Sequence, residues 1–84
     1  MSETLELRLF AGPAQELRSP SVRIALARLP CTVEELLGEL VAAHPVLVPY
    51  RKCLLVAVNR CLAHRGDRVD LGDEVAVFSP LAGG

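Results

Sequence analysis

One segment of the chain, residues 32–44, carries a clear helical pattern, and it restricts the fold more than any other feature. Thr32 and Glu35 have the spacing of a capping box, in which each side chain accepts a hydrogen bond from the other residue's backbone N–H. The residues that then fall on one helical face are Val33, Leu36, Leu37, Leu40, Val41 and His44. Pro45 disfavours helical geometry at His44, so we expect the helix to end there. A single helix with one apolar side must bury that side against another element, and a sheet of strands can provide the surface.

The remaining apolar segments have the patterns of strands. They are residues 5–10, 22–28, 54–58, a short segment near Leu62, and 74–78. The first two alternate strictly and predict an antiparallel pair, with a chain break at residues 11–13 and a helical turn over 14–18 between them. Residues 54–58 are apolar throughout, which favours a central strand. The order predicts an α+β fold, a mixed sheet with one main helix packed on one face.

Strand alternation places a second set of apolar residues on the sheet face that points away from the helix. These residues are Phe10, Leu55, Ala57, Leu62, Ala76 and Phe78, and they include both phenylalanines of the chain. No other predicted helix is available to cover them. A group of exposed apolar side chains favours a partner surface, with Phe10, Leu62 and Phe78 as its main contacts. The alternative is that they are scattered exposed apolar residues, which are common on proteins.

Length and charge exclude several classes of function. With 84 residues there is room for one domain, and a net charge of −1 without a basic block gives no indication of nucleic-acid binding. No apolar run approaches the roughly 20 residues that cross a bilayer, and the polar N-terminus does not resemble a signal peptide. We therefore expect a cytoplasmic protein without membrane contact.

The three cysteines do not have the spacing of a metal or redox site. Cys31, Cys53 and Cys61 are odd in number and lack any C-x-x-C pair, so we expect reduced thiols, with Cys53 partly buried, and no bound metal. His44 and His64 are expected to be exposed or capping residues. We find no paired acids, no catalytic triad and no metal cluster in the sequence.

The chain ends in Pro80-Leu81-Ala82-Gly83-Gly84, which we expect to form a flexible tail beyond a domain of residues 1–79. Pro80 lacks an N–H and separates the tail from the last strand. Two glycines make a thin terminus that can enter a channel too narrow for any Cβ. We expect Gly84 to be the last residue and to carry the free carboxylate. The alternative is an ordinary disordered end without a function.

Three motifs follow one another along the chain. They are Val56-Ala57-Val58-Asn59, Gly72-Asp73-Glu74-Val75-Ala76 and the terminal Pro-x-x-Gly-Gly. Together with Leu9-Phe10-Ala11 and Ala43-His44-Pro45, this set resembles the ubiquitin-like β-grasp sulfur carriers, and among them the MoaD family, the small subunit of molybdopterin synthase. The resemblance covers essentially the whole chain and implies a β-grasp fold.

The resemblance also implies a mechanism. A MoeB-like, E1-like enzyme would use ATP to adenylate the Gly84 carboxylate, and a sulfur donor system would convert the adenylate into a thiocarboxylate. The tail would then enter a MoaE-like large subunit, within a heterotetramer, and donate sulfur to precursor Z in molybdenum cofactor biosynthesis. Family members present apolar contacts to both partners where Phe10, Leu62 and Phe78 fall. The chain itself would bind no cofactor.

Two positions depart from the family pattern, and three alternatives stay open. Ser79 stands where many members have a proline, and the loop 12–15 lacks the basic residue that many members carry there. The alternatives are a sulfur carrier for thiamine or cysteine biosynthesis, a ubiquitin-like protein modifier that is joined to lysine through Gly84, and a plain binding module.

Overall fold

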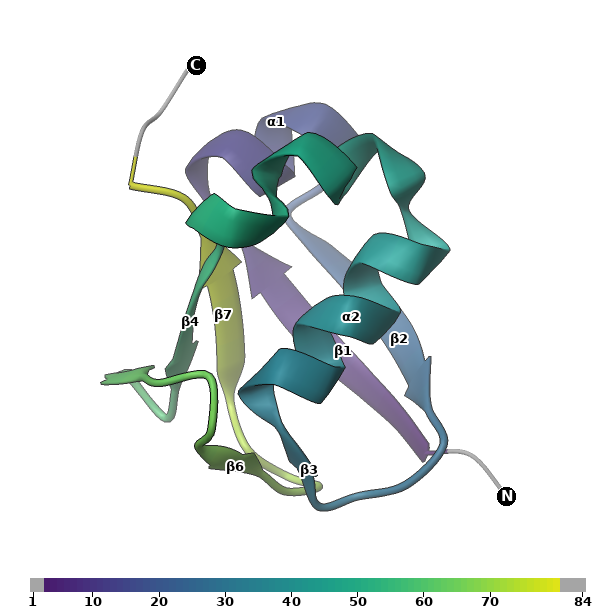
Figure 1. The fold of residues 1–84 in the computed structure, drawn as a ribbon, viewed down its shortest axis with the longest axis vertical. Coiled ribbons are helices and arrows are strands. Elements are labelled where there is room, and N and C mark those ends of the chain that lie inside the picture. Colours follow the sequence, from purple (N-terminus) through teal and green to yellow (C-terminus); the bar gives the residue numbers. More distant parts are fainter. Residues whose placement is uncertain (1–2, 81–84) are drawn as a thin grey trace.

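The computed structural model describes residues 3–80 and contains one layer of strands and one layer of helices (Figure 1). In chain order the elements are β1 (Glu3–Leu9), α1 (Ala11–Leu17), β2 (Ser21–Leu26), β3 (Cys31–Thr32), α2 (Val33–Ala43), the 3-10 helix η1 (Pro45–Cys53), β4 (Leu55–Val58), β5 (Cys61–Ala63), β6 (Arg68–Val69) and β7 (Val75–Phe78). Within residues 3–80, no helix is both long enough and apolar enough to cross a membrane.

The main sheet has five strands in the order β2-β1-β7-β4-β5. β1 pairs in parallel with β7, and the other neighbours are antiparallel, so the sheet is mixed. α2 crosses one face of this sheet, as Figure 1 shows. The predicted α+β architecture, the antiparallel pairing of the first two strands and the main helix on one face are therefore confirmed.

The local signals around α2 act as the sequence predicts. The Thr32 N–H donates to the Glu35 carboxylate at 2.9 Å, and the Glu35 N–H donates to the Thr32 hydroxyl at 3.1 Å, which completes the capping box. At the other end His44 is the C-cap, and its N–H donates to the Leu40 carbonyl at 2.9 Å. These contacts fix both ends of the helix that covers the sheet.

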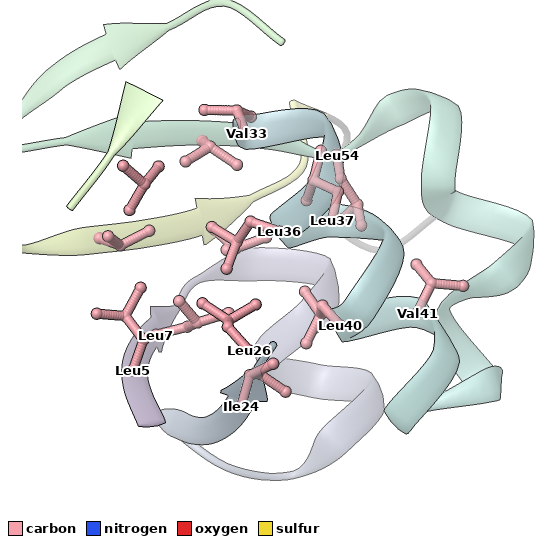
Figure 2. Packing of buried hydrophobic residues seen from close by; sticks show 14 of the residues in the cluster. Leu5, Leu7, Ile24, Leu26, Val33, Leu36, Leu37, Leu40, Val41 and Leu54 are labelled. Carbon is pink, nitrogen blue, oxygen red and sulfur yellow. The ribbon is translucent and has the colours of Figure 1, made fainter. Parts of the chain in front are cut away.

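The core lies between α2 and the sheet face beneath it. The strand residues that are buried there are Leu5, Leu7, Leu9, Ile24, Leu26, Val56, Val75 and Val77. Figure 2 shows Leu36 and Leu40 of α2 pointing toward Leu7 and Leu26. Since Leu7, Leu36 and Leu40 are each 0% exposed, the alternation in the sequence identifies the packed face of the sheet correctly.

The segment between β1 and β2 differs from the prediction. We expected a break at residues 11–13, a helical turn over 14–18 and a strand that reaches Phe10. Instead β1 ends at Leu9, Phe10 is the N-cap, and α1 begins at Ala11. Pro13 is compatible with the first turn because an N–H at that position has no helical partner to lose.

Two further expectations need correction, and the connection between α2 and β4 is helical. Residues 54–58 do not form the central strand: β7 occupies the centre of the sheet, and β4 lies beside it. The connection after α2 is the nine-residue η1, which buries Leu47. Cys53 is exposed, and the buried thiol is that of Cys31 in β3, which pairs with β6 in a second small sheet.

Candidate docking face

The sheet face that points away from α2 carries a group of apolar side chains, here called the apolar face. It consists of Phe10, Leu55, Ala57, Leu62, Ala76 and Phe78. Strand register brings these residues together, because residues paired across neighbouring strands share a face. Ala57 is paired with Leu62 on one side and with Ala76 on the other, and Leu55 is paired with Phe78.

The apolar face is open in the part of the chain that the structure describes. Phe10 is 51% exposed and Leu62 is 63% exposed, while Phe78 is half-buried. α1 and η1, which are longer than the helical turns expected from the sequence, lie at the end of the sheet where β1 and β7 finish (Figure 1). The side chains at the two edges of this face therefore remain accessible to another protein.

The end of β1 holds Phe10 on the apolar face. Its N–H donates to the Val77 carbonyl at 3.0 Å, and its backbone is extended, with φ −138° and ψ 154°. The extended backbone continues the alternation of β1, so the phenyl ring lies opposite the buried Leu9. Ala11 follows with φ 56°, a left-handed conformation that is uncommon for alanine and turns the chain into α1.

A tight turn holds Leu62. Asn59 and Arg60 both have positive φ, 53° and 69°, as a two-residue hairpin turn between β4 and β5 requires. The Asn59 side chain donates to Asp73 at 3.1 Å and accepts from the Glu74 N–H at 2.9 Å. Two motifs that are far apart in the sequence thus meet where β7 begins. Their polar residues stabilise the sheet beneath the apolar face.

The Asp73 carboxylate is part of the same turn cluster. It accepts hydrogen bonds from the Asp70 N–H at 2.8 Å and from the Asn59 amide at 3.1 Å. These two bonds favour the ionised form and hold the pKa of Asp73 below its usual value of 3.8. The shift follows from the role of Asp73 in the turn, and it does not indicate catalysis.

The C-terminal tail begins beside Phe78. Ser79 is buried with 7% exposure, and Pro80 is an exposed bend directly after it. The other predicted tail residues, Leu81, Ala82, Gly83 and Gly84, lie outside the described residues. Because Phe78 belongs to the apolar face, a protein bound there would also be next to the start of the tail.

The cysteine, histidine and acidic side chains of the described residues do not form a catalytic or metal-binding cluster. Within residues 3–80, no three His, Cys, Asp or Glu side chains are arranged to hold a metal ion. Burial raises the pKa of the Cys31 thiol, which lowers the fraction present as the reactive thiolate. His64 is exposed, and His44 caps α2. Arg8 of β1 is paired with Ala76 of β7, so a charged side chain borders the apolar face. The alternation of residues 5–10 already indicates this position, although Arg8 was not among the predicted contact residues.

A second charged group lies near the start of α2. Glu34 accepts hydrogen bonds from Arg65 at 2.8 Å and from Arg51 at 3.3 Å, and Arg65 also donates to the Arg51 and Leu54 carbonyls. The Arg65 bond is the main cause that lowers the pKa of Glu34 below its usual range. These contacts join α2, η1 and the loop after β5, so they hold the fold together.

Comparison with known proteins agrees with this architecture. The chain is 42% identical to the molybdopterin synthase sulfur carrier subunit of Chlamydomonas reinhardtii over 53 residues. That match spans 61% of this chain and 64% of the relative, which is less than two thirds of the relative's length. SAMP1, the small archaeal modifier protein 1 of Haloferax volcanii, is 32% identical, with a TM-score of 0.79 over 98% of this chain and 100% of SAMP1.

A further solved structure supports the fold alone. The complex of subunits 1 and 2 of the molybdopterin-converting factor from Helicobacter pylori contains a chain that is 18% identical, with a TM-score of 0.62. This match covers 98% of our chain and 100% of that chain. The family model that matches is that of the ThiS family, and it matches residues 8–84. The chain therefore belongs to the ThiS family of β-grasp proteins, to which the MoaD-type proteins that its sequence resembles are related.

Proposed function

We propose that the protein is the sulfur carrier subunit of a molybdopterin synthase and that Gly84 carries the sulfur. The observation that supports this most is the position of the apolar face, which extends to Phe78, two residues before the tail begins at Pro80. A partner that binds this face receives the tail at the same time. The similarity to the sulfur carrier subunit of Chlamydomonas reinhardtii supports the same choice of acceptor.

The proposed chemistry uses the terminal carboxylate. A carboxylate is a poor electrophile, so an E1-like enzyme first joins Gly84 to AMP, with pyrophosphate leaving from ATP. Sulfur from a donor system attacks the mixed anhydride, AMP leaves, and a thiocarboxylate is formed. In the large subunit the thiocarboxylate sulfur then attacks a carbon of precursor Z and displaces an oxygen from it, which gives a thioester. Water hydrolyses the thioester, so that the sulfur stays on the product and the Gly84 carboxylate is returned, and two such transfers supply the two sulfurs of the dithiolene. The other catalytic groups of these steps belong to the partner enzymes.

One face serves both partners in this proposal. The E1-like enzyme and the large subunit each need access to Gly84, and each gains apolar contact area from Phe10, Leu62 and Phe78. Because the two partners use the same surface, they bind in turn and not together. The proposal includes a heterotetramer with two large subunits and a cytoplasmic location.

Deletion of Gly84 tests the proposal. The variant is incubated with the E1-like enzyme, ATP and a sulfide source, and it is then mixed with the large subunit and precursor Z. We expect an unchanged circular dichroism spectrum and no dithiolene product, because the carboxylate is displaced by one residue from both active sites. Deletion of Met1 and Ser2 is the matched truncation and should leave the transfer intact. Transfer by the chain that lacks Gly84 would refute the mechanism.

A second candidate, a ubiquitin-like protein modifier, has a specific observation in its favour. SAMP1 of Haloferax volcanii is a modifier protein by name, and it matches this chain over nearly the whole length of both at 32% identity. A modifier would join Gly84 to a lysine side chain through an isopeptide bond. Tagged protein purified from its native cells under denaturing conditions distinguishes the two, since only the modifier is recovered covalently attached to other proteins.

A further inference from the structure

The start of the tail is packed against a glycine of α1. Gly12 is buried in the first turn of α1, and a Cβ built on it would lie 2.7 Å from the Ser79 Oγ. Contacts under 3.0 Å are essentially never made by real Cβ atoms. The same Cβ would lie 3.6 Å from the Ser79 Cβ, which is an ordinary van der Waals distance. The close approach is therefore to the Ser79 Oγ alone, and a Cβ at position 12 would force this oxygen out of its present place.

The Ser79 side chain is held in place by packing. Within residues 3–80, no hydrogen bond contributes to holding it. Ser79 is 7% exposed, and its Oγ has no hydrogen-bond partner among the described residues. Burial of an unpaired hydroxyl is unfavourable, because the group loses its hydrogen bonds to water. The side chain therefore stays at this point because α1 and the end of β7 enclose it. The next residue, Pro80, is already exposed.

The helix that encloses Ser79 is itself fixed at both ends. At its start, the N–H of the N-cap residue Phe10 donates to the Val77 carbonyl at 3.0 Å. Toward its end, the Tyr50 hydroxyl of η1 donates to the Glu16 carboxylate at 2.7 Å. α1 thus connects the exposed ring of Phe10 on the apolar face with the residue from which the tail leaves the domain.

We propose that Gly12 is a positioning residue for the tail. Its missing Cβ lets Ser79 seat against α1, and this sets the point at which Pro80 leaves the domain relative to the apolar face. The inference rests on the proposed function, because only a tail that must reach a partner's active site needs a defined origin. Residues 81–84 can span at most about 14 Å when extended, so a shift at Ser79 reaches Gly84 without a long linker to absorb it.

A Cβ at position 12 should slow sulfur transfer, because the reacting atoms must be placed correctly in the partner's active site. Misplacement by about 1 Å can reduce a rate by about a hundredfold, and we expect a short tail to recover part of that loss by its own freedom. We expect Gly12→Ala to lower the maximal rate of sulfur transfer about tenfold. The affinity for the large subunit should stay unchanged, since the apolar face is intact.

Substitution of Ser79 supplies the matched variants. Ser79→Ala removes the oxygen and should transfer sulfur at the normal rate. The double variant Gly12→Ala/Ser79→Ala should recover the normal rate, because only the Cβ to Cβ approach of 3.6 Å remains. A general loss of stability would reduce the amount of active protein, and it would not lower the maximal rate per folded molecule with an unchanged dissociation constant.

The experiment measures single-turnover transfer and large-subunit affinity for the three variants, together with the Gly84 deletion. A normal rate for Gly12→Ala, or a loss that Ser79→Ala does not repair, overturns the positioning role. Transfer by the Gly84 deletion instead overturns the proposed function. If Gly12→Ala does not fold, the contact is tested in the unmodified chain by NMR. A nuclear Overhauser effect between Gly12 Hα and Ser79 Hβ is expected, and its absence overturns the inference.

Discussion

The two faces of the sheet differ in how far their apolar side chains are exposed to solvent. On the face under α2, the strand side chains of Leu7 and Val77 are 0% exposed. On the apolar face, Phe10 is 51% exposed and Leu62 is 63% exposed, although both belong to the same sheet or follow one of its strands directly. The first face stabilises the domain. The second is available for another protein, and the difference predicts that substitutions on the two faces have separate effects.

The largest loss of stability is expected from a substitution on the sheet face under α2. Leu7→Ala removes a fully buried side chain and should lower the free energy of unfolding by about 3 kcal/mol, through lost burial and the cavity left behind. Urea unfolding measures this change. Phe10→Ala is the comparison on the apolar face and should cost well under 1 kcal/mol. Similar losses for both variants would contradict the separation of the two faces.

The next effect concerns binding. Leu62→Ser should weaken binding to the proposed large synthase subunit about tenfold, because an exposed apolar contact is lost. Leu71→Ser is the matched control, since Leu71 is 61% exposed but lies in the turn between β6 and β7. Isothermal calorimetry on both variants compares them. Equal losses would mean that Leu62 has no special place in binding.

The division between the faces was largely predictable from the sequence. Alternation in residues 5–9 and 75–78 assigns each side chain to a face, because the side-chain period of a strand is two. The capping box and Pro45 bound the helix through contacts only a few residues apart. Local rules of this kind need no knowledge of the tertiary structure, and the structure confirms them.

The features that the sequence did not reveal depend on distant contacts or on very short segments. Gly12 and Pro13 are strong chain breakers in isolation, yet they fit the first turn of α1. β3 and β6 have two residues each, too few to display a period. The seat of Ser79 against Gly12 joins residues 67 positions apart, and no pattern along the chain indicates it.

A smaller effect is expected where α2 begins. Thr32→Ala removes the hydroxyl that accepts from the Glu35 N–H and should cost about 1 kcal/mol of unfolding free energy. Affinity for the large subunit should not change, because Thr32 caps α2 and so lies on the opposite side of the sheet from the apolar face. Thermal unfolding and calorimetry test the two parts. Weaker binding by folded Thr32→Ala would show that the covered side also takes part in docking.

The smallest effect concerns pH. Since the pKa of Asp73 is held below its usual value of 3.8, its ionised form contributes stability at neutral pH. This contribution is complete above the unfolded-state pKa and is lost as the pH falls through the lower folded-state pKa. Asp73→Asn should therefore be less stable than the unmodified protein at pH 7, with a difference that shrinks in acid. Urea unfolding at several pH values measures it, and a difference independent of pH would contradict the role of the charge.

Hydrogen–deuterium exchange of the chain with and without the large subunit tests the central claim most directly. The claim is that the apolar face beside the tail, and not the helix-covered side, receives the partner. We expect increased protection in residues 61–63 and 76–79, and at Phe10 beyond that given by its hydrogen bond to Val77, with no change across residues 33–43 of α2. Protection of α2 with unchanged exchange on the apolar face would contradict the account.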